Sequence, residues 1–376
     1  MEVMRAALVY GINDMRVETV ERPAAPDGSI LIRVHSCAIC GTDRRIYKAG
    51  DYRAEYPVIT GHEIAGEVVE LGKGMRENPP GGADGNSCGD TNEYTYANMS
   101  GYSLGDRVCV APGHGCGRCA ACIKGFPNVC VNPYPSLGYK LNGGFAEYMA
   151  VPAHILRLGF VNRLPESLNY DQASLSEITA CCINAQNNVG ISKGDTVLII
   201  GAGPAGLIHA HLSKRNGAGR GIMAQRSRAR LDMAMKLFPG IVDDVIAISE
   251  EDLEESLFKK TDGIGADAVL VCAPSREVQE SAFKLAANRG RINFFGGLPN
   301  DDRLIRIDSN NLHYKELFVS GASSSLPETN REALKLLDER AIDPDKLITG
   351  RFGLDGIHEA FAAAEEKSCI KIVINP

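Results

Sequence analysis

The spacing of apolar residues divides the chain into parts of different texture. From Met1 to about Pro165, short apolar runs alternate with Gly, Pro, Asn and Asp, for example at residues 30–34, 66–71 and 107–110. Short runs bounded by turn-forming residues are typical of β-strands. We therefore expect residues 1–165 to be mainly β.

A second pattern extends from about Glu166 to Ala322. Helical patterns, one beginning at Ala205 and one running through Leu231, alternate here with apolar β runs at residues 196–200, 221–224, 268–272 and 291–295. Strands that alternate with helices predict a parallel, doubly wound sheet with helices on its faces. The expected fold class is therefore α/β, with a mainly β part beside it.

The remaining residues, 323–376, have too few apolar positions to bury a core of their own. They contain an amphipathic helix around residues 330–337, a second helix near 357–364 and a terminal β run at 370–374. We expect this segment to fold back onto residues 1–165 and to form with them one discontinuous domain, into which residues 166–322 are inserted.

Composition narrows the class of protein. At about 150 residues per domain, 376 residues predict roughly two domains. The net charge of −7 gives no basic field for nucleic acid or an anionic membrane surface, and we expect neither partner. No apolar run reaches the length of a signal peptide or a membrane span, so we expect a cytoplasmic protein. Residues 76–101, rich in Gly, Pro, Asn and Ser, resemble a surface loop of unassigned role.

A glycine motif follows the apolar run at residues 196–200. Gly201, Gly203 and Gly206, with Pro204 between them, stand immediately before a helical pattern. Glycines in this place permit a tight turn and close backbone approach, and the helix N-terminus offers free amides to a pyrophosphate. We interpret the motif as a dinucleotide-binding loop, the alternative being a glycine-rich turn of structural purpose.

The next strand indicates which dinucleotide is bound. NAD-binding chains place an Asp or Glu at its end to hold the ribose hydroxyls, but here the strand ends in Gln225, followed by Arg226 and Arg228. Arginines bind a 2′-phosphate, which a carboxylate would repel. We favour NADP, with Gln225, Arg226 and Arg230 as cofactor-binding candidates. NAD stays the alternative if the arginines are only solvated charges.

Four cysteines in a glycine-rich lobe at about residues 113–131 are spaced for a metal. Twelve cysteines without a secretion signal indicate metal ligands or buried thiols rather than disulfides. Thiolates spaced Cys-x2-Cys-x2-Cys-x7-Cys can surround one tetrahedral zinc ion. An iron–sulfur cluster fits less well, because its usual last interval is shorter and ends in Cys-Pro. The candidate ligands of this structural zinc are Cys116, Cys119, Cys122 and Cys130.

A second possible metal site combines Cys40, in Cys-Gly-Thr-Asp, with His62 and Glu63. Either residue type alone is commonplace in a protein core. An alcohol, however, releases a hydride readily only after its oxygen meets a Lewis acid and loses its proton. Beside a dinucleotide motif, these residues therefore predict a catalytic zinc.

Taken together, these motifs and the segment 105–108 (Gly-Asp-Arg-Val) resemble the zinc-containing medium-chain alcohol dehydrogenases over nearly the whole chain. Ser176-Glu177 resembles the Glu-containing helix start of the sorbitol and threonine dehydrogenase branch. In that branch, a Glu replaces the second Cys ligand of the liver-type alcohol dehydrogenases. The resemblance implies a Rossmann dinucleotide domain beside a GroES-like catalytic domain. It also implies two zinc ions per chain, and a homodimer or homotetramer.

The resemblance further implies roles for individual residues. Zinc would be bound by Cys40, His62 and Glu177, while Glu63 either binds the metal in some states or holds its water. Asp43 would orient His62. Thr42 would begin the relay that takes the alcohol proton to solvent, as hydride passes to the nicotinamide.

One departure bears on the substrate. Arg45 stands where threonine dehydrogenases, and often polyol dehydrogenases too, carry a His. A guanidinium stays protonated and cannot accept a proton, so the proton relay must differ and threonine becomes a less favoured substrate. Residues 292–299 and His313-Tyr314 resemble bacterial sugar-alcohol dehydrogenases. We therefore expect a small secondary alcohol, most simply a polyol. The alternatives are a threonine-type amino alcohol, a butanediol-type vicinal diol, and a noncatalytic zinc and dinucleotide-binding protein.

Overall fold

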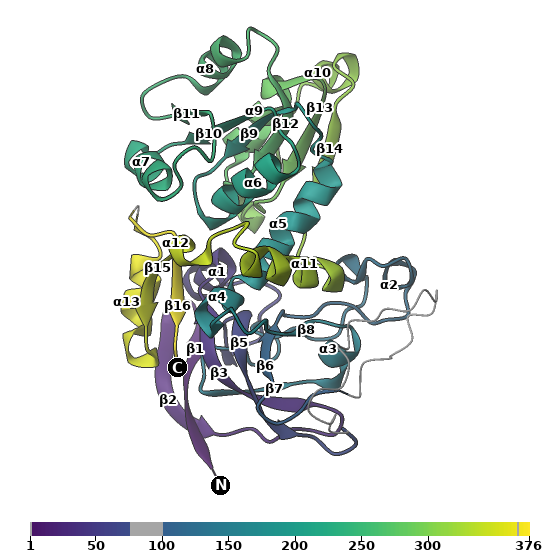
Figure 1. The fold of residues 1–376 in the computed structure, drawn as a ribbon, viewed down its shortest axis with the longest axis vertical. Coiled ribbons are helices and arrows are strands. Elements are labelled where there is room, and N and C mark those ends of the chain that lie inside the picture. Colours follow the sequence, from purple (N-terminus) through teal and green to yellow (C-terminus); the bar gives the residue numbers. More distant parts are fainter. Residues whose placement is uncertain (1, 76–100, 367) are drawn as a thin grey trace. The chain divides into compact units, whose positions relative to one another are not determined.

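The computed structural model describes residues 2–75, 101–366 and 368–376, so that almost all of the loop predicted at 76–101 lies outside the described residues. The chain divides into two compact units (Figure 1). The first unit comprises Met1–Glu177 and Ser325–Pro376, and the second comprises Ile178–Ser324. The first boundary falls inside helix α5 (Ser176–Val189).

The second unit is built on a parallel sheet. Among the described residues, six strands lie in the order β11-β10-β9-β12-β13-β14, and every neighbouring pair is parallel. These strands are β9 (Thr196–Ile200), β10 (Arg220–Gln225), β11 (Asp244–Ala247), β12 (Ala266–Val271), β13 (Ala286–Phe294) and β14 (Phe318–Gly321). Strands β10 and β11 build outward on one side of β9, and β12, β13 and β14 build outward on the other, so the predicted doubly wound sheet is confirmed.

Helices connect these strands and pack on the sheet. They are α6 (Pro204–Arg215), α7 (Arg228–Leu237), α8 (Leu253–Lys260), α9 (Arg276–Leu285) and α10 (Ser309–Tyr314), with a short helix η2 (Asn300–Asp302). Four of the five residues of β9 are buried, as expected of a strand covered on both faces. The sheet order reverses between β9 and β12, which puts a crevice at the carboxyl ends of these strands.

The first unit is mainly β. Its strands are β1 (Val3–Gly11), β2 (Asp14–Glu21), β3 (Ile30–Ala38), β4 (Val58–Ile59), β5 (Glu63–Leu71), β6 (Arg107–Val110), β7 (Tyr148–Val151), β8 (Val161–Arg163), β15 (Ile348–Phe352) and β16 (Lys371–Ile374). Strands β2-β1-β4 form one sheet, and β15-β16-β3-β5-β6-β8 form a second in which β7 also pairs with β3. One apolar cluster fills the space around them, with fully buried Phe145 and Ile64 among its members.

Short helices complete the first unit. They are α1 (Gly41–Ala49), α2 (Ala120–Ile123), α3 (Ala153–Arg157), α4 (Tyr170–Ser174), α11 (Pro327–Asp338), α12 (Pro344–Leu347) and α13 (Ile357–Ala363), with the short helices η1 (Pro127–Val129) and η3 (Leu354–Gly356). Within residues 2–75, 101–366 and 368–376, no helix combines the length and apolar character needed to cross a membrane.

The last strand joins distant parts of the chain. Strand β16 pairs antiparallel with β3, with Val373 opposite Ala38, and the Ile39 amide donates to the Ile372 carbonyl at 2.9 Å. All four residues of β16 are buried. The C-terminal segment thus completes the sheet of the first unit, and one residue of β16, Lys371, enters the site described next.

Candidate metal and cofactor sites

Asp43 organises the turn that carries the first candidate ligands. Its Oδ2 accepts the Cys40 amide at 2.8 Å, which caps the start of α1, and its Oδ1 accepts the Gly61 amide at 3.0 Å. The same Oδ1 lies 3.2 Å from Nδ1 of His62. Because the buried Asp43 carboxylate lies on the Nδ1 side of the ring, Nε2 is the nitrogen left for a metal.

Charges around His62 favour its protonated form. Burial would lower the pKa of the imidazole, but Tyr139, Asp43 and Cys40 together hold that pKa well above its ordinary value. Burial likewise opposes ionisation of Asp43, yet His62 and two backbone amides keep its pKa below the usual value. A metal needs neutral imidazole, so a metal bound at His62 would compete with a proton.

Glu63 opens strand β5 and is fully buried. Its Oε1 accepts a hydrogen bond of 2.6 Å from Nζ of Lys371, which is itself only 3% exposed. Its Oε2 is buried and has no hydrogen-bond partner among the described residues. One oxygen is thus fixed by β16 while the other is left for a ligand. The sequence gives no sign of this lysine, because its partner lies more than 300 positions away.

Cys40, His62 and Glu63 form one group, in which the candidate ligand atoms all lie within 4.8 Å of one another. Thiolate, imidazole and carboxylate are the donors that zinc takes in proteins, and the unpaired Glu63 oxygen suits a cation. These residues therefore fit the zinc that the sequence predicts.

The other predicted residues lie around this group. Glu177 lies in the first turn of α5 and is 5% exposed. It is not a member of the group formed by Cys40, His62 and Glu63. Its charge nevertheless helps raise the pKa values of Lys371 and Tyr139. Thr42, in the first turn of α1, accepts a long hydrogen bond of 3.5 Å from Nη2 of Arg45. The structure thus brings Glu177 near the group without placing it among the ligands.

Three residues near this group escape sequence reasoning. The Tyr139 ring lies 5.4 Å from the His62 ring, and the Arg53 guanidinium lies 4.9 Å from the centre of the Tyr139 ring. Burial, then the charges of Arg53 and His62, lower the pKa of His114 to about 4. A tyrosine or arginine in a loop has no spacing that distinguishes it from a core or surface residue, so a single sequence gives no signal for them.

The four cysteines of the lobe also converge. Sulfur–sulfur distances are 3.5 Å between Cys119 and Cys122, 3.6 Å between Cys119 and Cys130, and 4.0 Å between Cys116 and Cys122. Four sulfurs about 2.3 Å from one tetrahedral ion would stand about 3.8 Å apart. The Cys122 amide is the main cause that lowers the pKa of Cys119, to about 6, whereas burial raises the pKa of Cys130 to about 12. The donor set fits a closed structural zinc site.

The glycine motif forms the turn from β9 into α6. Gly201 has φ of +122°, and a Cβ at Gly206 would stand 1.8 Å from the Gly201 carbonyl oxygen, so both positions require glycine. Gly203 is the N-cap of α6 and Pro204 its first residue. Arg230 donates from Nε to the Ala202 carbonyl at 3.3 Å, which holds that side chain against the loop.

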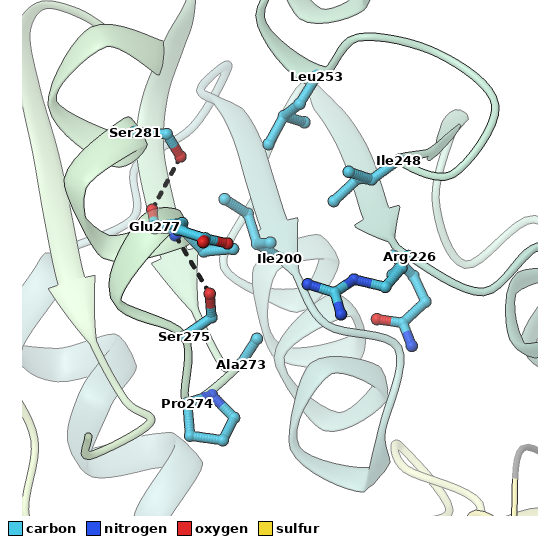
Figure 2. Close-up of a pocket in the computed structure, with 11 residues that line it drawn as sticks. Ile200, Arg226, Ile248, Leu253, Ala273, Pro274, Ser275, Glu277 and Ser281 are labelled. Atoms are coloured by element: carbon cyan, nitrogen blue, oxygen red, sulfur yellow. Dashed lines mark hydrogen bonds between the residues drawn. The ribbon is translucent and has the colours of Figure 1, made fainter. Parts of the chain in front are cut away.

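A cavity of about 450 Å³ lies beside this turn at the carboxyl ends of the strands (Figure 2). In Figure 2, Arg226 lies on one wall, and Ser275 and Glu277 lie on the other. The lining residues are Ile200, Gln225, Arg226, Ile248, Leu253, Ala273, Pro274, Ser275, Glu277, Val278 and Ser281. Gln225 and Arg226 thus face one space, whereas Arg228 pairs with Asp232 at 3.1 Å.

Comparison with known proteins agrees with this geometry. Residues 26–159 match the model of the alcohol dehydrogenase GroES-like domain, and residues 204–339 match that of the zinc-binding dehydrogenase. The chain is 32% identical to L-threonine 3-dehydrogenase of Pyrococcus abyssi, over 99% of this chain and 97% of that protein. It is 28% identical to sorbitol dehydrogenase of Halalkalibacterium halodurans, over 98% and 97% of the two chains.

Two solved structures are similar over all of both chains at 27% identity. One is a zinc-binding dehydrogenase from Sinorhizobium meliloti 1021 bound to NADP, with a TM-score of 0.85. The other is an alcohol dehydrogenase from E. coli CFT073 complexed with NADH, with a TM-score of 0.83. The predicted pairing of a Rossmann domain with a GroES-like domain is confirmed. The chain belongs to the zinc-containing medium-chain alcohol dehydrogenase family and has sorbitol and L-threonine dehydrogenases among its relatives.

Proposed function

We propose that this enzyme oxidises a secondary alcohol, most simply a polyol, by hydride transfer to NADP. The observation that carries the proposal is the buried group of Cys40, His62 and Glu63, in which Asp43 orients the imidazole and one Glu63 oxygen is left without a partner. A noncatalytic protein has no need to maintain such a costly set of buried polar groups.

Each residue of the group has a role in this reaction. Cys40 and His62 would bind the catalytic zinc, with Glu177 as the third protein ligand and Glu63 as an additional one. The bound zinc supplies Lewis acidity, which lowers the pKa of the alcohol oxygen. Lys371 fixes one Glu63 oxygen and places a positive charge beside this buried carboxyl group.

Thr42 would take the alcohol proton. Its Oγ1 accepts from Arg45 with one lone pair, which leaves the second lone pair for the substrate hydroxyl and its own O–H to donate onward. Arg45 cannot be the next acceptor because its guanidinium stays protonated. The relay therefore leaves Thr42 by a water or a cofactor hydroxyl.

The second unit supplies the cofactor site. The loop at Gly201, Gly203, Pro204 and Gly206 would hold the pyrophosphate at the N-terminus of α6. Arg226 borders the cavity without an ion-pair partner among the described residues, so it is available for a 2′-phosphate, with Gln225 and Arg230 beside it. NAD remains the alternative cofactor, since one similar structure holds NADP and another NADH.

Two comparisons, each over nearly the whole chain, bear on the substrate. The 28% identity to a sorbitol dehydrogenase supports a polyol. Arg45 replaces a His that threonine dehydrogenases carry and polyol dehydrogenases often carry, so it makes threonine less favoured without by itself selecting a polyol. The 32% identity to an L-threonine 3-dehydrogenase keeps an amino alcohol as the second candidate, with a vicinal diol beside it.

The decisive experiment is a hydride-transfer assay of the zinc-loaded enzyme with NADP and NAD, on polyols, L-threonine and 2,3-butanediol. We expect turnover on a polyol that is lost in Glu177→Ala but kept in Glu359→Ala, because Glu359 is an exposed glutamate in the first turn of α13. Turnover on L-threonine alone would overturn the polyol assignment. No turnover on any alcohol, with zinc and cofactor bound, would overturn the enzyme assignment.

The cofactor assignment has its own matched pair of variants. Loss of charge-assisted hydrogen bonds to a phosphate costs roughly 1.5–3 kcal/mol, so Arg226→Ala should raise the KM for NADP about ten- to a hundredfold. Arg228→Ala, whose side chain already pairs with Asp232 and Glu250, should not. An unchanged KM in Arg226→Ala would favour NAD.

We further propose that the enzyme is a homodimer or homotetramer. Strand β14 is the outer strand of the parallel sheet, and Phe318 and Val319 on it are 56% and 41% exposed. An open edge with large apolar side chains favours pairing with another chain. Sedimentation velocity of the wild type and of Phe318→Asp would test this, since the variant should dissociate.

A further inference from the structure

A cluster of basic side chains stands beside the candidate zinc site and takes no part in the reaction described above. It consists of Arg45 on α1, and Arg53 on the loop between α1 and β4, both paired with Asp51. The Asp51 side chain is 4% exposed, whereas the two arginine side chains are 38% and 36% exposed. A buried carboxylate thus holds two partly exposed guanidinium groups at the surface of this loop.

The charges of this cluster do not cancel. Arg53 donates to Asp51 from Nε at 2.9 Å and from Nη2 at 2.7 Å, and Arg45 donates to the same carboxylate at 3.1 and 2.9 Å. Two cations share one anion, so one positive charge is in excess. Within the described residues, the Nη1 groups of both arginines stay outside these pairings, and exposed Glu55 of the same loop pairs with neither.

Contacts tie this excess charge to the candidate zinc ligands. Arg53 lies 4.9 Å from the centre of the Tyr139 ring, and the Tyr139 ring lies 5.4 Å from that of His62. The loop that carries Arg53 is also fixed to Tyr139, because the Glu55 amide donates to the Tyr139 carbonyl at 3.1 Å. At the other end, Arg45 donates to Thr42, the proposed proton acceptor. Arg53 from the loop and Arg45 from α1 therefore both lie beside residues of the proposed reaction.

Two neighbouring ionisable groups among the described residues, Glu63 and His114, do not supply the missing anion. Glu63 is already paired with Lys371. His114 is an imidazole, which carries no negative charge whether it is neutral or protonated. A planar guanidinium with free N–H groups binds carboxylate or phosphate oxygens well. A neutral polyol offers no such group.

We propose that Arg53, assisted by Arg45, binds an anionic group on the substrate, so that the preferred alcohol is a polyol bearing a carboxylate or a phosphate. This inference rests on the proposed alcohol oxidation and names its substrate class. Arg53 becomes a specificity-determining residue that contacts the acid group, while the hydroxyl to be oxidised lies at the zinc.

The first test compares a neutral polyol with its terminal phosphate ester and with the aldonic acid of the same chain length. The wild type should prefer one of the two acids in kcat/KM, and the better acid identifies the group. In Arg53→Ala the preference ratio should fall roughly ten- to a hundredfold, as expected for lost charge-assisted hydrogen bonds. Arg53→Lys, which keeps the charge but not the planar fork, should fall less.

Arg163→Ala is the matched control. Arg163 also belongs to the first unit, pairs with Asp106 at 3.0 Å and lies 5.5 Å from the centre of the Tyr102 ring, with 41% of its side chain exposed. It repeats the pairing of Arg53 away from the candidate zinc ligands, and its removal should leave the preference ratio unchanged. Arg53→Ala should also fold, because Asp51 retains Arg45 as a partner.

A second test does not depend on turnover. Gluconate and sorbitol 6-phosphate are each titrated calorimetrically into the zinc-loaded protein saturated with reduced cofactor, and into the Arg53→Ala and Arg163→Ala variants. Binding of either acid that weakens at least tenfold only in Arg53→Ala supports the inference. A preference for the neutral polyol, or binding of both acids that is equal in all three proteins, overturns it even if alcohol oxidation stands. Absence of turnover with Arg53-dependent binding of one acid would instead reject the proposed reaction and keep the anion site.

Discussion

The buried ion pair between Lys371 and Glu63 gives the most direct test of how the first unit is held together. Lys371→Met keeps the length and apolar stem of the side chain and removes its charge. The Glu63 carboxylate, fully buried, would lose the 2.6 Å hydrogen bond and its counter-charge. An ion left unpaired in a protein core typically costs 3–5 kcal/mol. We therefore expect the free energy of unfolding of the zinc-free protein to fall by about 3–5 kcal/mol.

Two further variants separate the charge from the packing. The double variant Glu63→Gln with Lys371→Met removes both charges, so most of the lost stability should return. Lys335→Met removes a lysine from an exposed pair with Glu339, where 69% and 43% of the side chains are accessible, and should cost less than about 1 kcal/mol. Binding of zinc should stabilise Lys371→Met more than the wild type, because the metal offers Glu63 a new counter-charge.

The assay is urea unfolding with chelator or with zinc, followed by circular dichroism, since the chain contains no tryptophan for fluorescence. Hydrogen exchange in β3 and β5 would assign the loss to the first unit. The reasoning is refuted if Lys371→Met unfolds within 1 kcal/mol of the wild type, or if the double variant is as unstable as the single one.

Other expected outcomes follow from the lobe, the glycine turn and the loop carboxylate. Cys130→Ser should reduce the zinc bound per chain by one equivalent, as measured by metal analysis. Cys109→Ser changes a buried thiol outside the lobe and should keep the full zinc content. Equal zinc content in the two variants would exclude the lobe site. Gly206→Ala should lower the midpoint of thermal unfolding, because the added Cβ would stand 1.8 Å from a backbone oxygen. Gly203→Ala is the control, since its Cβ would stand 3.9 Å from the flexible end of an arginine side chain. Equal midpoints in the two variants would contradict this reasoning. Burial opposes ionisation of Asp51, but its arginine partners depress its folded-state pKa below the unfolded value of about 3.9. The ionised Asp51 therefore stabilises the folded protein fully above that pH, and this stabilisation is lost as the pH falls through the folded-state pKa. Asp51→Asn should accordingly flatten the acid side of a plot of the free energy of unfolding against pH.

Periodicity predicts the regular elements of this protein well. The run at residues 196–200 is β9 itself, and the helices expected near residues 330–337 and 357–364 are present as α11 and α13. The apolar pattern works here because burial on two faces or on one helical stripe leaves a clear signature. The sequence identifies Cys40, the N-cap of α1, and the first three residues of α1 only as a ligand motif. This short helix depends on the Asp43 cap rather than on an apolar stripe.

Local motifs also point to the candidate ligands. Cys40, His62 and Glu63 are brought together, as are the four lobe cysteines. The sequence does not predict the residues from distant segments that contact these ligands, namely Lys371 beside Glu63 and Tyr139 beside His62. Their contribution arises from strand pairing and loop docking, which one sequence does not encode in any local spacing.

The pairing of β16 with β3 has a consequence for how the chain is made. Residues 178–324 are contiguous, so the second unit can fold as soon as they leave the ribosome, in the usual order of domain folding during synthesis. Most residues of the first unit are synthesised earlier, yet its larger sheet lacks β15 and β16, and Glu63 lacks its partner, until residues 348–374 emerge. The sheet that is synthesised first is therefore expected to be finished last, with β3 exposing an unpaired edge in the meantime.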